Sequence, residues 1–420
     1  MVPPRRPNRP RGPSVGHGTH GTLEQIRVLR RFLCVFPPSS FTISLQSTPL
    51  RELRAPRFIT RPPFIKPPGT AQPYTYSRSK NPTRSLLENT LADLEGGTQA
   101  FAFGSGMAAI SAVFSLFATG DHILVAQNLY GGTHQLLTDL MNRIGLNVTY
   151  VDMTDLQHVA QQIRANTRAL YLETPSNPTL TITDMRAMVT LAHAYKLWTI
   201  ADNTFMSPYL QKPLSLGVDI VIHSATKFLA GHSDVLAGTV IVKSGDLAKR
   251  LDQIQVIYGG ILGPEDSWLT LRGLKTLAVR LDRSQDNAQR LAHFLTQHDA
   301  VQKVHYPGLP GHPGHGLHHR QAEGPGAVLS FELLHPHTIG DFIKRLRYAL
   351  YAVSLGGVET IVSHPTTMSH QALSSSEQRA MGVTPGLLRV SVGIESAEDL
   401  IEDFGQALNF SVTKAETTTR

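Results

Sequence analysis

The sequence predicts an α/β protein in which a large, mostly parallel sheet is followed by a smaller α/β domain. Between residues 74 and 242, short apolar runs of strand length alternate with stretches of helical periodicity. Such alternation is typical of parallel strands joined by helices that cover both faces of the sheet. A long helical stretch then leads into a second part of the chain, where strands and helices alternate again.

Seven runs have the character of buried strands and predict a seven-stranded sheet, at 100–103, 123–126, 148–151, 169–173, 198–202, 219–223 and 239–242. A first helix is expected over 83–95, because its leucines share one face and two glycines, Gly96 and Gly97, end it. Further helices are predicted between the strands, at 107–117, 132–143, 156–165 and 184–195.

The second part is expected to begin with one long helix, and its elements are predicted at 267–296, 327–332, 388–392 and 397–409. We therefore predict a large domain over 74–266 and a small domain over 267–420. Residues 1–73 form an extension of different composition, since they hold 14 of the 27 prolines. Four interpretations stay open for it: a disordered arm, a targeting peptide, upstream sequence read from a wrong start or frame, or a basic arm that binds nucleic acid.

Charge and cysteine content narrow the class of protein. The net charge of +7 arises in the extension, where residues 1–61 carry eleven arginines and two acids; the other 28 basic and 30 acidic residues nearly cancel. We therefore expect no nucleic-acid partner for the body of the chain. Cys34 is the only cysteine and no apolar run reaches membrane-spanning length, so the sequence predicts a cytoplasmic protein without disulfides or membrane contact.

Lys227 is the first candidate for a catalytic residue. Apolar residues 220–222 end a buried strand just before it, and open α/β sheets bind their ligands at the carboxyl ends of strands. A desolvated lysine there can lose its proton near neutral pH and attack a carbonyl compound such as pyridoxal phosphate. Ser224 and Thr226 flank Lys227 with hydroxyls suited to a phosphate. The alternative is an exposed lysine in a loop.

A glycine turn at Gly104-Ser105-Gly106-Met107 joins a predicted strand to a predicted helix. The backbone N–H groups of Gly106 and Met107 would bind a phosphate at the start of that helix, supported by the helix dipole. The segment also matches the G-x-G-x-x-A fingerprint, so a nicotinamide oxidoreductase is the alternative class. Against that class, Asp121 lies in a Gly-Asp turn and not at a strand end, where a ribose-binding acid belongs.

Three more polar side chains follow strands of the same sheet. The ring of Tyr130 could lie against a flat cofactor, or it could pack on its own turn. Asn177 could hydrogen-bond a ring oxygen or close an Asx turn. Asp202 ends a buried strand and needs a cationic partner, such as a protonated pyridine nitrogen, unless it only caps a turn. Together with Lys227 and the glycine turn, these residues predict one pyridoxal phosphate site.

Several motifs occur in order between Tyr74 and Leu408: Tyr76-Ser77-Arg78 with Asn81-Pro82-Thr83, Gly104-Ser105-Gly106-Met107, Glu173-Thr174-Pro175-Ser176-Asn177-Pro178, Ala201-Asp202-Asn203-Thr204, Ser224-Ala225-Thr226-Lys227, Ser354-Leu355-Gly356-Gly357 and Leu388-Arg389-Val390-Ser391-Val392-Gly393. By these motifs the chain resembles the pyridoxal-phosphate enzymes of cysteine and methionine metabolism. The resemblance implies the aspartate-aminotransferase-like fold, fold type I, with the cofactor in the large domain.

The resemblance also implies a role for each matching residue. Lys227 would hold the cofactor and then transfer protons, Asp202 would pair with its pyridine nitrogen, and Tyr130 would stack on its ring and help to deprotonate the substrate amine. The phosphate would be bound by the groups already named, Gly106, Met107, Ser224 and Thr226.

Substrate and subunit contacts follow from the same resemblance. Arg389 would bind the substrate α-carboxylate through its planar guanidinium, with Ser354 beside it. Tyr76 and Arg78 would reach the phosphate in a neighbouring subunit, with Tyr76 also near the substrate. This arrangement implies a homotetramer built from dimers that share active sites.

The tracts 259–264, 271–277 and 367–370 look most like those of bacterial cystathionine lyases. This likeness implies a trans-sulfuration reaction, β-elimination from L-cystathionine to homocysteine, pyruvate and ammonia. Cystathionine γ-lyase, cystathionine γ-synthase, methionine γ-lyase and O-acetylhomoserine sulfhydrylase are the alternatives. Gly132 replaces a cysteine usual in methionine γ-lyases, which counts against that activity. Val353 replaces a glutamate of many cystathionine γ-lyases and is closer to methionine γ-lyases and sulfhydrylases, so the two positions conflict.

Two departures from the family pattern leave a non-enzyme alternative open. Lys80 stands where a glycine usually precedes Asn-Pro-Thr, and the extension has no counterpart of the family's N-terminal segment. The non-enzyme alternative is therefore an inactive homologue that binds the cofactor without turning over a substrate.

A last stretch, rich in glycine and proline, contains His312, His315, His318 and His319. Their spacing is not that of regular metal ligands. We therefore predict a surface connection and no metal site.

Overall fold

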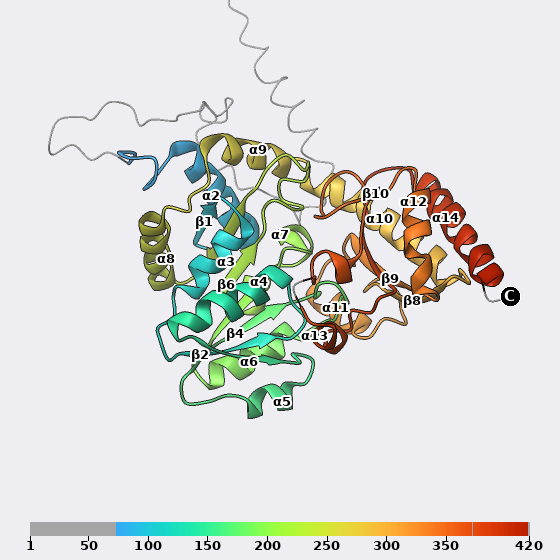
Figure 1. Cartoon of the computed structure of the whole chain (residues 1–420). Helices are drawn as coiled ribbons and strands as arrows, with labels where there is room; N and C mark the ends of the chain where they lie inside the picture. The colour runs from blue at the N-terminus through green and yellow to red at the C-terminus, as the bar shows by residue number, and fades with distance from the viewer. Residues whose placement is uncertain (1–72, 372, 419–420) are drawn as a thin grey trace, which may run out of the picture. The chain divides into compact units, whose positions relative to one another are not determined.

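A computed structural model describes residues 73–371 and 373–418. Two sheets with their helices make up this part of the chain (Figure 1). The predicted extension, residues 1–73, lies outside the described residues except for Pro73. None of its four interpretations is therefore decided by the structure.

The large sheet has seven strands in the order β1-β7-β6-β5-β4-β2-β3. All neighbouring strands are parallel except β7, which runs antiparallel to both β1 and β6. The predicted mostly parallel, seven-stranded sheet is confirmed. Its strands are β1 (Gln99–Phe103), β2 (His122–Ala126), β3 (Asn147–Val151), β4 (Thr167–Glu173), β5 (Trp198–Asp202), β6 (Ile220–His223) and β7 (Gly238–Val242).

The helices of this part are α2 (Pro82–Glu95), α3 (Gly106–Phe114), α4 (Gly131–Gln135), α5 (Leu156–Gln161), α6 (Met185–Ala194), α7 (Ser207–Leu210) and α8 (Gly245–Tyr258). Helix α2 begins where the Asn81 side chain accepts the N–H groups of Thr83 and Arg84, and it ends at Gly96 in the left-handed conformation. The helix predicted over 132–143 is wrong in form, because α4 continues as a π-helical turn, Leu136–Met141, and a 3-10 turn, Asn142–Ile144.

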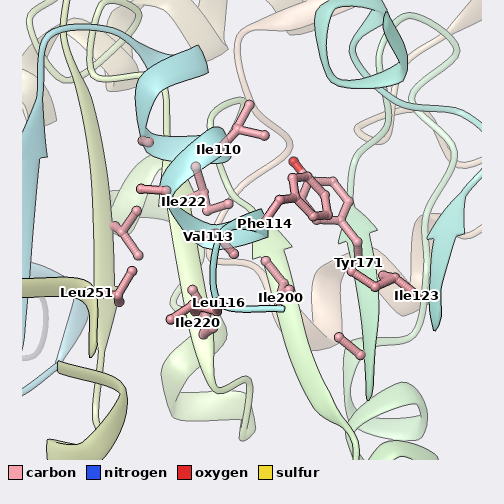
Figure 2. Packing of buried hydrophobic residues seen from close by; sticks show 14 of the residues in the cluster. Ile110, Val113, Phe114, Leu116, Ile123, Tyr171, Ile200, Ile220, Ile222 and Leu251 are labelled. Carbon is pink, nitrogen blue, oxygen red and sulfur yellow. The ribbon is translucent and has the colours of Figure 1, made fainter. Parts of the chain in front are cut away.

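Alternation along β4 and β5 places two carboxylates, those of Glu173 and Asp202, on one face of the large sheet. Tyr171 of β4 and Ile200 of β5 point into the core under α3, where the Phe114 ring stacks on Tyr171 at 5.4 Å between centroids (Figure 2). Since side chains two residues apart share a face, Glu173 and Asp202 point to the same side. Both carboxylates therefore end their strands on the face that α3 covers.

The second sheet has five strands in the order β10-β11-β12-β9-β8, antiparallel except for the pair β10 and β11. Helices α12 and α14 pack against each other beside it (Figure 1). The strands are β8 (Val301–His305), β9 (Val328–Leu333), β10 (Leu350–Tyr351), β11 (Ile361–Ser363) and β12 (Leu387–Ser391), and the helices are α9 (Pro264–Leu274), α10 (Leu277–Thr296), α11 (His315–Gln321), α12 (Ile339–Arg345), α13 (Ser375–Ala380) and α14 (Ala397–Thr418).

One long helix over 267–296 was expected, and two are observed. Helix α9 ends at Leu274 and α10 begins at Leu277. The buried Arg280 holds the break, because its guanidinium donates to the carbonyl of Gly273 at 2.9 Å and to the hydroxyl of Thr276 at 3.1 Å. A sequence pattern does not reveal such a contact, since residues on both sides of the break keep helical spacing.

The surface connection predicted for the histidine-rich stretch is confirmed only in part, since Pro313, Gly316 and His319 are exposed but other residues of the stretch are not. Residues 315–321 form α11, and His318 is fully buried with its Nε2 2.9 Å from the carbonyl of Gly324. His312 is buried as well. Within residues 73–371 and 373–418, no three His, Cys, Asp or Glu side chains gather as ligands of a metal ion. No helix of the same residues is long and apolar enough to cross a membrane.

Candidate active site

Lys227 lies in the turn that follows β6, where the sequence predicts it. Its Nζ donates a hydrogen bond to the Ser354 hydroxyl at 2.7 Å. Burial, together with the nearby Arg389 cation, lowers the pKa of the Lys227 ammonium to about 8. With this pKa, about one tenth of the amines are neutral at pH 7, against fewer than about one in a thousand for an ordinary lysine. The structure thus provides an amine that can act as a nucleophile or base.

Ser354 joins this lysine to the second sheet. Its backbone has φ +86, the left-handed region, which is costly for a residue with a side chain. Strain of this kind gathers at functional sites. The conformation directs the hydroxyl to Lys227 and the carbonyl to Arg389, whose Nη2 donates at 2.9 Å.

Arg389 of β12 is 4% exposed and crosses from the second sheet to the large one. Its Nη1 donates to the Asn177 side-chain oxygen at 3.0 Å, while its Nε has no partner. Burial lowers the pKa of the guanidinium to about 10, so it stays charged at neutral pH. Among the described residues, no carboxylate lies within ion-pair distance of it. A buried cation without an ion pair is suited to bind a carboxylate ligand.

Asp202 and Glu173 lie opposite each other in the parallel pair of β4 and β5. One oxygen of Asp202 accepts the N–H and the hydroxyl of Thr204, at 3.0 and 2.5 Å. Burial raises the pKa of Asp202. Burial, and next the Asp202 carboxylate, raise the pKa of Glu173 well above its ordinary value. Because two buried carboxylates side by side are unfavourable, a cation bound beside Asp202 would stabilise the site.

The glycine turn and the Lys227 turn touch at the start of α3. Ser105 caps this helix by accepting the N–H of Ala108 at 3.1 Å. A Cβ built on Gly106 would lie 2.8 Å from the Ser224 hydroxyl oxygen, so the two predicted phosphate ligands are in contact. The Thr226 hydroxyl instead bonds the backbone of Ala237, at 2.9 and 3.1 Å, and closes the turn.

Tyr130 follows β2 and begins α4. The space beside Gly132 is bounded by the Tyr130 ring and the Met107 sulfur, which a Cβ built on Gly132 would meet at 2.5 and 3.1 Å. Tyr130 and Met107 therefore line one place, near the start of α3. Tyr130 as a whole residue is 42% exposed, so a ligand can reach it.

Tyr76 and Arg78 are not brought to Lys227 within the chain. The Arg78 guanidinium lies 5.1 Å from the centre of the Tyr76 ring and donates to the carbonyl of Val256 at 2.6 Å. Tyr76 is 57% exposed. Their predicted contact with a neighbouring subunit stays a prediction.

Sequence reasoning missed three residues that shape the site. Glu173 bonds two of its loops, Thr204 holds Asp202, and His370 lies buried with its Nε2 unpaired. Burial, and next Arg389, lower the pKa of His370 to about 4, so it is neutral. All three residues stand in motifs or tracts by which the sequence resembles the family, but a motif does not identify the partner of each side chain.

The assembled side chains fit pyridoxal phosphate. The amine of Lys227 suits its aldehyde, and the carboxylate of Asp202, which lacks a cation, suits its pyridine nitrogen. The start of α3, with the Ser224 hydroxyl against Gly106, suits its phosphate. Fold and site thus define a pyridoxal-phosphate-dependent α/β enzyme.

The comparison with known proteins gives the family. The chain belongs to the Cys/Met metabolism PLP-dependent enzymes, whose sequence model matches residues 63–409. It is 55% identical to cystathionine beta-lyase MetC of Bacillus subtilis (strain 168) over 335 residues, 80% of this chain and 86% of the relative. The cystathionine gamma-lyase of the same organism is 47% identical over 80% of this chain and 88% of its own.

Solved structures agree with this family. A cystathionine gamma synthase from Xanthomonas oryzae pv. oryzae, in complex with cystathionine, superimposes with a TM-score of 0.83 at 41% identity. The match covers 85% of this chain and 92% of that one. The predicted fold type and cofactor class are therefore confirmed.

Proposed function

We propose that this enzyme cleaves the C–S bond of L-cystathionine by β-elimination. With one water, the reaction gives homocysteine, pyruvate and ammonia. The observation that carries the proposal is the hydrogen-bonded path from Lys227 through Ser354 to Arg389. It places a basic amine beside the guanidinium suited to the α-carboxylate of an amino acid. The higher identity to a named beta-lyase, 55% against 47% for a gamma-lyase, supports β- over γ-elimination.

Arg389 would orient the substrate. Its buried guanidinium has an unpaired Nε, and Asn177 and Ser354 hold its two terminal nitrogens. A carboxylate that binds there is fixed in direction as well as in place, since a planar guanidinium donates along defined lines. The Cα of an amino acid is bonded to that carboxylate, so Cα is directed to Lys227.

When bound, pyridoxal phosphate supplies an electron sink next to Cα of the substrate. Asp202 would hold its pyridine nitrogen, Tyr130 its ring, and the N–H groups of Gly106 and Met107 its phosphate, with the Ser224 hydroxyl beside them. The roles of Thr226 and of Asn177 toward the cofactor belong to the same proposal.

Lys227 would move the protons of the reaction. As a neutral amine it takes the proton from Cα, and the resulting ammonium can return a proton to the departing sulfur or to the product carbon. The Ser354 hydroxyl, 2.7 Å from Nζ, limits the positions that the amine can take. The lowered pKa, about 8, makes both protonation states accessible near neutral pH.

We further propose a homotetramer of dimers that share active sites. Support comes from Tyr76 and Arg78, which contact each other and the end of α8 and not Lys227. A domain boundary near residue 266 and a cytoplasmic location complete the proposal. The last strand of the large sheet ends at Val242, and the first strand of the second sheet begins at Val301. This separation along the chain supports the boundary.

The test is to incubate the cofactor-loaded protein with L-cystathionine and identify the keto acid by mass spectrometry. Pyruvate with homocysteine supports the proposal. 2-Oxobutyrate with cysteine would replace β- by γ-elimination, and no keto acid at all would favour the inactive homologue. The Lys227→Ala variant, treated in parallel, corrects for contaminating lyases.

A further inference from the structure

Glu173 is a buried carboxylate at the end of β4 that makes two hydrogen bonds to separate loops. One oxygen accepts the backbone N–H of Tyr130 at 2.9 Å, and the other accepts the backbone N–H of Asn177 at 3.1 Å. The side chain is 6% exposed. Its two oxygens thus join a loop after β2 to a loop after β4.

The two loops carry side chains that the proposed function assigns to the cofactor. Tyr130 supplies the aromatic ring, and Asn177 supplies an amide whose oxygen is held by Arg389 at 3.0 Å. If the Glu173 carboxylate moved, the ring of Tyr130 and the amide of Asn177 would both change position. No other described carboxylate accepts hydrogen bonds from either residue.

Glu173 also lies near enough to Arg389 to affect the pKa of the guanidinium. Burial lowers the pKa of Arg389, and Glu173 acts in the opposite direction by favouring the protonated guanidinium, although no ion pair is formed. The guanidinium is therefore stabilised from a distance, and its nitrogens stay bonded to neutral oxygens of Asn177 and Ser354. A carboxylate bound directly to Arg389 would instead compete with the substrate.

We propose that Glu173 is the positioning residue of this site: it fixes Tyr130 and Asn177 for cofactor binding and balances Arg389 without occupying it. The inference rests on the proposed function, since it concerns the same cofactor and substrate. It adds to that function a residue, Glu173, that is not proposed to contact the cofactor or the substrate.

The test uses three variants of the full chain. Glu173→Gln keeps the length of the side chain, but its amide nitrogen would face one of the two N–H donors. Glu173→Asp keeps the charge and is too short to bond both loops. Asp403→Asn is the matched control, because Asp403 is also buried and accepts the N–H groups of residues 347–349, far from these loops in sequence.

Each variant is stripped of cofactor and titrated with pyridoxal phosphate, and hydrogen exchange is followed at Tyr130 and Asn177. We expect Glu173→Gln to weaken cofactor binding about 10- to 100-fold, since a buried N–H loses its acceptor. Exchange should accelerate at both residues. Glu173→Asp should also weaken binding, but it should raise KM less than Glu173→Gln does, because the charge near Arg389 remains.

Asp403→Asn should accelerate exchange at residues 347–349 only and leave the cofactor dissociation constant within about twofold. If Glu173→Gln and Asp403→Asn bind the cofactor alike, or if Tyr130 and Asn177 exchange as in the wild type, Glu173 is only structural and the inference is wrong. A wild-type chain that binds no pyridoxal phosphate overturns the proposed function itself, and with it this inference.

Discussion

Two buried arginines show how a structural cation differs from one at a binding site. Arg280 and Arg389 are both at most 5% exposed, and burial lowers the pKa of each to about 10. Arg280 bonds the carbonyls of Phe228 and Gly273 and the hydroxyl of Thr276, so all three of its nitrogens are used. Arg389 keeps an unpaired Nε. Burial of an arginine alone does not indicate a binding site. An arginine nitrogen that lacks an acceptor, close to a reactive lysine amine, does indicate one.

The buried carboxylates divide in the same way. Asp403 accepts three backbone N–H groups at 2.8 to 3.1 Å and joins α14 to the segment before β10. Glu173 and Asp202 instead lie side by side, and burial raises the pKa of both. A single buried carboxylate that accepts backbone N–H groups stabilises the fold, whereas two adjacent buried carboxylates without an ion-pair partner among the described residues indicate a site for a ligand.

The largest expected effect separates two lysines. Lys227→Ala should lower kcat at least about 1,000-fold and abolish the absorbance of the lysine-bound cofactor, because base and attachment point are lost together. Lys243, whose Nζ bonds the carbonyl of Leu214 at 2.9 Å, is the control, and Lys243→Ala should leave both unchanged. A cofactor band that survives in Lys227→Ala would contradict the assignment.

The next effect tests the two arginines directly. Arg389→Lys should lower kcat/KM about 10- to 100-fold, mainly through KM, since an ammonium group lacks the two parallel, coplanar N–H donors with which a guanidinium binds a carboxylate. Arg280→Lys should lower the melting temperature and leave KM unchanged. Steady-state kinetics and thermal unfolding of both variants would measure this contrast. Equal KM values would remove Arg389 from the substrate site.

The lowered pKa of Lys227 predicts how cofactor loading depends on pH. The neutral amine reacts, so the loading rate of the cofactor-free chain should rise with pH and level off above the pKa of about 8. Between pH 7 and 9 the expected rise is roughly tenfold, against about 100-fold for an ordinary lysine. In the unfolded chain Lys227 has the higher pKa of an ordinary lysine. Between the folded and the unfolded pKa the unfolded chain binds more protons than the folded protein, so the free energy of unfolding should also rise with pH there. Stopped-flow absorbance would follow the loading.

The smallest effect concerns the contact between the Tyr130 loop and the loop at Ser369, which connects β11 to β12. A Cβ on Gly131 would lie 2.2 Å from the Ser369 carbonyl oxygen, so Gly131→Ala should cost about 1–3 kcal/mol of stability. A Cβ on Gly340 meets nothing within 4 Å, so Gly340→Ala is the control. Chemical denaturation would compare them. If Gly131→Ala and Gly340→Ala unfold with equal free energies, the Tyr130 loop and the Ser369 loop can move apart without loss of stability.

Most of the large sheet could be predicted from the sequence, because its strands are continuous apolar runs that end in polar residues. Lys227 and Asp202 were found by that rule, and both lie at the carboxyl edge. Helix α8 was not predicted, since only four of its residues are buried. The role of Glu173 was missed because its partners lie in loops, one of them 43 residues away.

The contact between Gly106 and Ser224 predicts which residue types can occur together at these two positions in other members of the family. A methyl group at the first position and a hydroxymethyl at the second cannot both fit, since they would be 2.8 Å apart. Gly238 leaves no room on the remaining side, where a Cβ would lie 2.1 Å from the Ser105 carbonyl oxygen. A relative with a larger residue at position 106 should therefore have a smaller residue at position 224, and a larger residue at 224 requires glycine at 106. A sequence with bulky residues at both has lost this turn, whatever its overall similarity.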